Sequence, residues 1–211
     1  MSNLAMKHST YDLSIYAANQ MEDRYIELSF PTPFLSDFTK YSYANYIDKS
    51  YPLAISRQES RFNYSVIAFD GGVGLMQLMP PTAAYIAKKS GSKNCYRQSA
   101  DCNIKFGSWY LGSLYSKFNK DLIYATAAYN AGPGRARRWQ DKLGKLDNPV
   151  QIELIPIQIT RDYVQKVLSN KAVYDSVFAQ KNTVDLLSYI DKISKNHYLN
   201  QIDDDNADIN R

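Results

Sequence analysis

The amino-acid sequence predicts an all-α globular fold, and three observations support this class. Apolar residues recur at intervals of three and four in several segments, which is typical of amphipathic helices. No segment alternates strictly between apolar and polar residues, and no Asn-Gly or Asp-Gly turn joins two β-branched runs. Of the 211 residues, 45% are hydrophobic and 22% are charged, a balance that favours a folded core over disorder.

The first 36 residues show little apolar periodicity, and only residues 11–18 suggest a helix there. The segment Phe30-Pro31-Thr32-Pro33-Phe34 ends this region, and closely spaced prolines are typical of a joint between structured parts. We therefore predict a linker over residues 1–36 and one domain over residues 37–180.

Helical periodicity runs through this domain, over residues 53–62, 82–89, 104–118, 135–143 and 164–168, and returns at 186–193. Prolines and glycines fall at the ends of these segments, as is typical of helix starts and stops. Pro52 and Pro81 open the first two segments, and Gly91 follows the second. Gly132 lies in a sharp turn between two helices. Residues 181–211 are expected to form a C-terminal helix and an acidic tail.

A cluster of three glycines within residues 71–74, directly after Asp70, marks a break between two helices. Glycine adopts positive φ at no steric cost and lets another group approach the backbone closely. We expect a tight loop here with one or both of these properties.

Charge and hydropathy exclude two classes of protein. The net charge of +4 is too small, and too evenly distributed, to indicate a nucleic-acid-binding protein. No run approaches the roughly 18 consecutive apolar residues that a membrane-spanning helix needs, and residues 1–7 lack the apolar centre of a secretory signal. Taken alone, this start predicts a cytoplasmic protein or a fragment of a longer chain.

Two cysteines, Cys95 and Cys102, lie seven positions apart in a polar stretch. The second Cys/His pair that a zinc site requires is missing beside them, so we expect no metal and no cofactor. The two thiols either stay free or form a disulfide, which the chain-entropy model values at about 2.5 kcal/mol for so short a loop.

Glu59 is the carboxylate that the helical pattern singles out. Ile55, Glu59 and Phe62 fall at i, i+4 and i+7, so the carboxyl lies on the stripe that should face inward. Burial disfavours an ionised carboxylate and raises its pKa, so such a group can hold a proton near neutral pH and act as a general acid. The alternative is a glutamate at the edge of the stripe, paired with a base such as Arg57 or Arg61.

Four further patterns carry a resemblance to one enzyme family. They are residues 58–63 (QESRFN), 74–80 (GLMQLMP), 127–135 (AAYNAGPGR) and the pair 152–156 (IELIP) and 160–164 (TRDYV). In content and order they resemble the catalytic domain of the soluble lytic transglycosylases, a family related to goose-type lysozyme. The resemblance covers about residue 34 to residue 174, and it implies an all-α, lysozyme-like domain with a substrate cleft.

The resemblance also implies roles for individual residues. Glu59 matches the single catalytic acid, and Ser60 matches the residue whose hydroxyl braces the local backbone. The positions that match substrate-contacting residues are Gln77, Met79, Tyr129, Asn130, Glu153 and, as a weaker candidate, Tyr163. By residue type alone, Met79 and Tyr129 could equally be core, whereas the Gln77 amide in an apolar loop needs partners such as sugar hydroxyls.

Three departures from the family pattern bear on substrate contacts and rate. Ala68 stands where the family has a serine, Phe69-Asp70 replaces a small or proline-containing pair, and Ile159 replaces an acidic residue. None of the three affects Glu59. The cluster of Arg135, Arg137 and Arg138 is interpreted as a solvated helix face, the alternative being a contact with anionic wall polymer.

The family's reaction implies that Glu59 protonates the β-1,4 glycosidic oxygen between N-acetylmuramic acid and N-acetylglucosamine, and that a 1,6-anhydromuramyl end forms without water. Three alternatives remain open at this point. They are a goose-type hydrolase that adds water at the same bond, a peptidoglycan-binding module with weakened catalysis, and a purely structural helical protein.

The partner implied by the resemblance is the peptidoglycan glycan strand, with no nucleic acid and no integral membrane segment. A monomer is expected. Peptidoglycan lies outside the cytoplasmic membrane, so the expected location is the periplasm or cell envelope. We reconcile this with the missing signal by expecting a piece of a longer chain, in which residues 1–36 resemble the end of the helical domain that precedes the catalytic domain.

Overall fold

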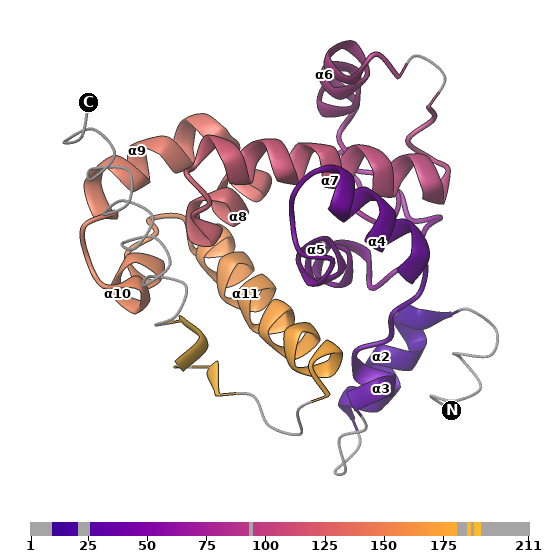
Figure 1. Cartoon of the computed structure of the whole chain (residues 1–211), viewed down its shortest axis with the longest axis horizontal. Coiled ribbons are helices and arrows are strands. Elements are labelled where there is room, and N and C mark those ends of the chain that lie inside the picture. The colour runs from indigo at the N-terminus through magenta and orange to yellow at the C-terminus, as the bar shows by residue number, and fades with distance from the viewer. Residues whose placement is uncertain (1–9, 21–25, 93–94, 181–184, 187, 191–211) are drawn as a thin grey trace, which may run out of the picture. The chain divides into compact units, whose positions relative to one another are not determined.

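The computed structural model describes residues 10–20, 26–92, 95–180, 185–186 and 188–190. The helices, in order along the chain, are α2 (Tyr11–Asn19), α3 (Ile26–Ser29), α4 (Leu35–Ala44), α5 (Ser50–Ser60), α6 (Pro80–Ser90), α7 (Ala100–Lys117), α8 (Leu122–Ala131), α9 (Pro133–Leu143), α10 (Asn148–Glu153) and α11 (Gln158–Phe178) (Figure 1). Among the described residues there is no β-strand, only two isolated bridges that join Val73 to Ile67 and to Leu78. The all-α prediction is confirmed.

The chain divides into two compact units, which we call unit 1 (Met1–Gly112) and unit 2 (Ser113–Arg211). The boundary falls inside α7 and matches neither boundary predicted from the sequence, because long-range packing and not local composition defines it. The predicted division at residues 36 and 180 stays a prediction. No helix in the described part of the chain is long and apolar enough to cross a bilayer.

In unit 1, α5 is the central helix. All of its residues from Ser50 to Ser56 are buried, and Leu53 and Ile55 are completely so. The prediction of a helix over 53–62 is wrong at both ends, because α5 starts at Ser50 and stops at Ser60, where Arg61 and Phe62 adopt positive φ. Phe62 still reaches the core, where its ring packs edge-on against that of Phe38 at a centroid distance of 6.4 Å.

Two short helices, α2 and α3, pack against each other at the start of unit 1. Arg57 of α5 contacts the segment that follows them. Its Nε donates to the carbonyl of Ser29 at 2.9 Å, and its guanidinium lies 4.1 Å from the centroid of the Phe30 ring. The region predicted as a linker thus contains helices, and Ser29 at the end of α3 and the following Phe30 contact α5.

The junction of α6 and α7 forms a second apolar cluster in unit 1. Its buried members are Leu78, Ala83, Ile86 and Phe106, and Cys95 packs against them. Gly107 allows α7 to approach the loop that precedes α6, since a Cβ at this position would overlap the sulfur of Met76. The predicted helix over 82–89 lies within α6, and the one over 104–118 lies within α7 except for Phe118, which follows the last helical residue, Lys117.

Unit 2 is organised around α8, which is buried from Leu122 to Ala128 and packs against both α9 and α11. The side chain of Asp121 caps its N-terminus by accepting hydrogen bonds from the backbone N–H groups of Ile123 and Tyr124, at 2.9 and 3.2 Å. Gly132, at φ 87°, makes the predicted turn into α9. A helix all of whose sides are apolar must be surrounded by protein, and α8 has this character.

The C-terminal helix predicted at 186–193 is described only at residue 186 and residues 188–190, which are helical. This stretch contacts α10 and α11, because Tyr189 donates to Asp175 at 2.9 Å and Asn148 donates to the carbonyl of Ile190 at 3.2 Å. The acidic tail lies outside the described residues.

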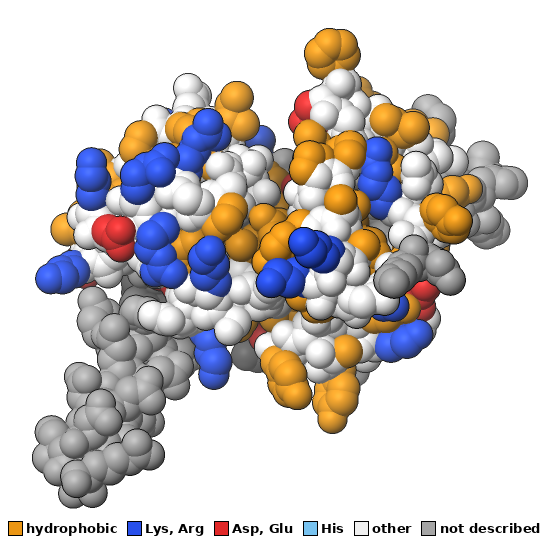
Figure 2. Space-filling model, turned by 90° about the horizontal axis from the view of Figure 1, so that it is seen from above, with side chains coloured by type: hydrophobic (Ala, Val, Ile, Leu, Met, Phe, Trp, Pro, Cys, Tyr) orange, Lys and Arg blue, Asp and Glu red, His pale blue; other side chains and the backbone are white. Residues whose placement is uncertain are grey.

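The basic face of α9 is only partly solvated. Figure 2 shows Lys and Arg side chains on the side of the view where α9 lies, and Arg135 and Arg138 are exposed. Arg137 differs from them. Its guanidinium lies 4.7 Å from the centroid of the Phe118 ring and donates to the carbonyl of Lys117 at 2.7 Å. The stacking and the carbonyl bond hold the Arg137 side chain against the end of α7, and the residue is half-buried.

Candidate active site

Glu59 occupies the last turn of α5 and is half-buried. The helical stripe predicted that it would face inward together with Ile55 and Phe62, which are 0% and 1% exposed. The helical pattern therefore overestimated the burial of Glu59. Because the helix ends one residue later and the chain turns away, Glu59 keeps part of its surface exposed on a helix that is buried from Ser50 to Ser56.

The hydroxyls of Ser60 and Ser56 fix this last turn. Both donate to the carbonyl oxygen of Leu75, at 2.8 and 3.0 Å respectively. Ser60 was singled out by the resemblance, whereas Ser56 was missed, although a serine four residues earlier on a buried helix face was a usable signal. The two bonds join the last turn of α5, which carries Glu59, to the loop that contains the glycine cluster. We call this loop the glycine loop.

This loop, residues 71–79, has the backbone that the glycine cluster predicted. Gly71 and Gly74 have φ angles of 92° and 75°. A Cβ on Gly74 would lie 2.7 Å from the side-chain nitrogen of Asn103, so close approach and positive φ both require glycine here. Asn103 is 1% exposed and binds the loop twice, since it accepts from the Met76 N–H and donates to the Val73 carbonyl, each at 2.8 Å.

Gln77 and Met79 are half-exposed, whereas the other residues from Gly72 to Leu78 are buried. Leu75, Met76 and Leu78 are each 2% exposed or less. The Gln77 amide nitrogen donates to the carbonyl of Gly74 at 2.8 Å, so the protein itself supplies a partner that sequence reasoning had sought in a sugar. Met79 precedes α6, whose first two residues are prolines, and these hold the helix start rigid.

In unit 2, Tyr129 and Asn130 lie near the C-terminal end of α8, half-buried and exposed respectively. The hydroxyl of Thr160, in the first turn of α11, donates to the side-chain oxygen of Asn130 at 2.8 Å. This bond brings together two of the sequence patterns and fixes the orientation of the Asn130 amide.

Glu153 is the last residue of α10 and is exposed. Its Oε1 accepts from the side-chain nitrogen of Gln165 at 2.6 Å, and its backbone carbonyl accepts from Arg161 at 3.1 Å. Arg161 was quoted in the pattern but given no role, and it also binds the carbonyl of Ile155 at 3.3 Å. Tyr163 is 6% exposed, which leaves it little surface for substrate.

Three tyrosines outside these motifs have a raised pKa. Burial is the main cause for Tyr124 and Tyr110. For Tyr41, burial and a 2.7 Å hydrogen bond to Asp101 together raise the pKa. Within the described residues, no three His, Cys, Asp or Glu side chains group as metal ligands would.

Comparison with known proteins identifies the family of this chain. Residues 36–152 match the family model described as "Transglycosylase SLT domain". A soluble lytic murein transglycosylase from Salmonella typhimurium is 37% identical over 192 residues, which is 87% of this chain and 30% of that protein.

Two solved structures agree with this match. A lytic transglycosylase Slt from Pseudomonas aeruginosa, in an inactive variant with glutamine in place of a glutamate, shares 34% identity at a TM-score of 0.79 and covers 87% of this chain and 31% of that one. The 70-kDa soluble lytic transglycosylase of Escherichia coli shares 36% identity at a TM-score of 0.78 and covers 85% of this chain and 30% of that one. The present chain thus spans about a third of the length of these relatives. Its helical fold is the lysozyme-like one of these enzymes, and the chain belongs to the transglycosylase SLT domain family.

Proposed function

We propose that the chain is a peptidoglycan lytic transglycosylase that cleaves the β-1,4 bond between N-acetylmuramic acid and N-acetylglucosamine without consuming water. The observation that carries the proposal is the placement of Glu59, a half-buried residue on a helix turn that Ser56 and Ser60 fix to the loop of Gln77. Family membership supports it, as does the inactive glutamate-to-glutamine variant of the related Pseudomonas aeruginosa enzyme.

In the proposed reaction Glu59 acts first as an acid and then as a base. Its carboxyl gives a proton to the glycosidic oxygen, and the bond from that oxygen to the muramyl anomeric carbon breaks. The 2-acetamido oxygen of the same sugar forms a bond to that carbon, giving an oxazolinium-like intermediate. The Glu59 carboxylate then takes the proton of the C6 hydroxyl, and O6 displaces the acetamido oxygen. One proton leaves and one returns, and an internal nucleophile replaces the second carboxylate that most glycosidases use.

In each unit, taken by itself, we propose residues that contact the glycan. Gln77 and Met79 expose part of their side chains from a loop whose backbone is fixed, and Tyr129 offers an amphipathic ring of the kind that packs on sugar faces. Asn130 is exposed and oriented by Thr160, and Glu153 is exposed with one oxygen bound to Gln165. For Tyr163 we propose a supporting role behind such contacts.

The proposed substrate also sets the proposed location and state. Peptidoglycan lies outside the cytoplasmic membrane, so we propose that the protein works in the periplasm or cell envelope. The proposed catalytic acid and the proposed substrate contacts all belong to one polypeptide. We therefore propose that the protein acts as a monomer.

Mass spectrometry of digested peptidoglycan tests this proposal. We expect soluble muropeptides with 1,6-anhydromuramyl ends and no product from Glu59→Gln. Products heavier by one water, with reducing ends, would instead establish the goose-type hydrolase. Binding to sacculi without release of muropeptides would establish the binding module. If Glu59→Gln and the parent behaved identically, the chain would be a purely structural helical protein.

A further inference from the structure

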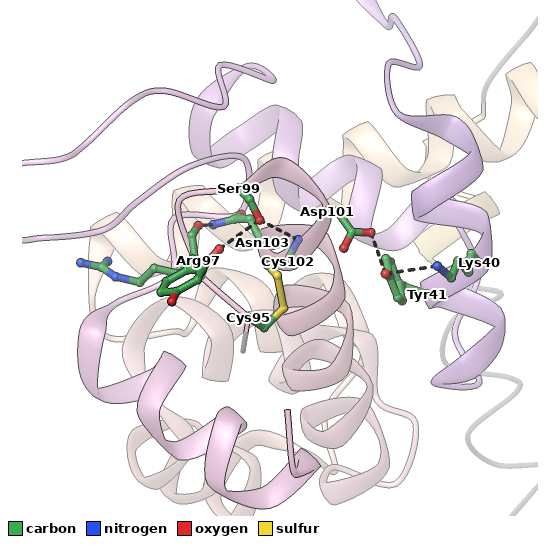
Figure 3. The surroundings of a disulfide bond; sticks show 9 residues. Lys40, Tyr41, Cys95, Arg97, Ser99, Asp101, Cys102 and Asn103 are labelled. Atoms are coloured by element: carbon green, nitrogen blue, oxygen red, sulfur yellow. Dashed lines mark hydrogen bonds between the residues drawn. A yellow bond between two sulfur atoms is a disulfide. The ribbon is translucent and has the colours of Figure 1, made fainter. Parts of the chain in front are cut away.

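Cys95 and Cys102 are joined by a disulfide, with their Cα atoms 5.4 Å apart, so the alternative of two free thiols does not hold (Figure 3). The closed segment ends on the first turn of α7, where the hydroxyl of Ser99 accepts from the N–H of Cys102 at 3.3 Å. Figure 3 shows the Arg97 side chain leaving this segment on the side away from the sulfur atoms. The disulfide therefore fixes the short piece of chain from which Arg97 extends.

Arg97 reaches the glycine loop at both of its ends. Its Nη1 donates to the carbonyl of Gly71 at 2.8 Å and to that of Leu78 at 2.7 Å. One charged nitrogen thus joins the residue that opens the loop to the residue beside Gln77 and Met79. Hydrogen bonds from a charged donor are stronger than neutral ones, and they hold the carbonyls in a fixed direction.

The same segment is tied to the middle of the loop through Asn103. The Asn103 amide nitrogen donates to the carbonyl of Arg97 at 2.7 Å as well as to that of Val73 at 2.8 Å. The loop is consequently held from three directions, by the serine hydroxyls of α5, by Asn103 of α7 and by Arg97. Of these three supports, only Arg97 lies on an irregular segment, and the disulfide closes that segment.

We propose that Arg97 is a positioning residue for substrate binding, which holds residues 71–79 in the conformation that presents Gln77 and Met79 to the glycan, and that the Cys95–Cys102 disulfide holds Arg97. This inference rests on the proposed function for its substrate. Arg97 is half-buried and bonded to backbone carbonyls, so it acts through the loop and not by contact with the sugar.

Kinetics on soluble glycan strands test the role of Arg97. Arg97→Ala should raise KM about tenfold and change kcat by less than about twofold, because the two charge-assisted bonds that are lost go to Gly71 and Leu78 of the loop, whereas the serine bonds that hold the turn of Glu59 remain. Arg97→Lys keeps one charged nitrogen and should recover most of the affinity. Gln98→Ala, an exposed neighbour on the same segment, is the matched control and should behave like the parent. An unchanged KM for Arg97→Ala would overturn the proposal, as would a loss confined to kcat.

The disulfide is tested by a double-mutant cycle. Cys95→Ser combined with Cys102→Ser should raise KM in the same direction by a smaller factor, about threefold, and should add nothing in the Arg97→Ala background. Dithiothreitol should reproduce the effect in the parent and have none in the serine variant. Fully additive effects would show that the disulfide does not act through Arg97.

Hydrogen exchange separates this inference from the proposed function. The N–H groups of Gly74 and Leu78 bond to the carbonyls of Val66 and Val73, at 2.9 and 3.1 Å. Arg97→Ala should speed their exchange about tenfold while the α8 amides stay unchanged. If the parent cleaves no peptidoglycan but these amides respond, the proposed function fails and the positioning of the loop by Arg97 stands. Unchanged exchange overturns the positioning itself, whatever the enzyme does.

Discussion

The two units hold their candidate site residues by different means. In unit 1 the last turn of α5 and the glycine loop are fixed by side-chain hydrogen bonds to backbone carbonyls, from Ser56, Ser60, Asn103 and Arg97. In unit 2, Tyr129 and Asn130 lie near the end of α8, a helix fixed mainly by apolar packing. Directional bonds set the position of a few atoms, whereas burial supplies most of the folding energy. Substitutions in the first set should therefore change activity more than stability, and substitutions inside α8 should do the reverse.

The largest effect is expected from Glu59→Gln. The amide keeps the shape of the side chain but has no acidic proton, so kcat should fall about 10³-fold, within the usual range for a general acid. The free energy of unfolding should change by less than about 0.5 kcal/mol, because the group is half-buried at a helix end. Turnover on glycan strands and urea unfolding measure the two quantities. Glu153→Gln is the control. A similar fall in its kcat would contradict the assignment of Glu59 as the catalytic acid and of Glu153 as a substrate contact.

Next in size is the loss of stability expected from Ile123→Ala, inside α8. Ile123 is 1% exposed, and truncation of such a side chain leaves a cavity that costs about 3 kcal/mol. At a temperature where the variant is still folded, kcat should stay within about twofold of the parent. Val150→Ala, at a side chain that is 44% exposed, should cost much less. Thermal unfolding gives the comparison, and equal losses for the two variants would contradict an α8-centred core.

A smaller effect is expected from Ser60→Ala. The Leu75 carbonyl keeps its bond from Ser56, so the free energy of unfolding should fall by only about 1 kcal/mol. Loosening of the turn that carries Glu59 should lower kcat about fivefold, a larger change in function than in fold. Ser36→Ala, which removes an exposed hydroxyl of unit 1, serves as the reference in both assays. A stability loss without a kinetic one would place Ser60 among ordinary core contacts.

The smallest effect is expected on the thermal stability of the protein in alkaline solution. The raised pKa values of Tyr124 and Tyr110 mean that the unfolded chain, with tyrosine pKa near 10, loses these protons first as the pH rises. This contribution to stability is fully present below pH 10 and is lost progressively above it. Tyr124→Phe should flatten the fall of Tm above pH 10 and leave Tm near pH 7 almost unchanged, because the buried hydroxyl has no hydrogen-bond partner in the described part of the chain. A pH profile of Tm that matches the parent would contradict this.

Patterns that repeat along the chain predicted most of the helices, whereas isolated contacts stayed hidden. The apolar period located α7 and part of α11, prolines and glycines at segment ends located α6 and α9, and the glycines marked the loop at 71–74 and the turn at Gly132. The short helices α4 and α10 were missed, because 10 and 6 residues with few apolar positions give a weak period. The burial of Glu59 was overestimated, since the period continued past the point where Arg61 and Phe62 turn the backbone.

Among the supporting residues, Ser60 came from a motif, and Ser56, Asn103 and Arg97 came only from the structure. Each of these three binds a backbone carbonyl between 19 and 30 positions away, and a backbone carbonyl is the same in every residue. No residue type marks the acceptor, so no sequence pattern identifies the pair.

The sequence by itself determined the all-α class, the candidate acid Glu59 and the places where the chain must turn, because helical period, a carboxyl group and glycine backbone freedom are local properties. Only the tertiary structure decided how far Glu59 is exposed, that Cys95 and Cys102 are bonded, and that Arg97 spans the glycine loop. These features depend on which distant groups share the same space, and that is settled by packing the whole unit at once.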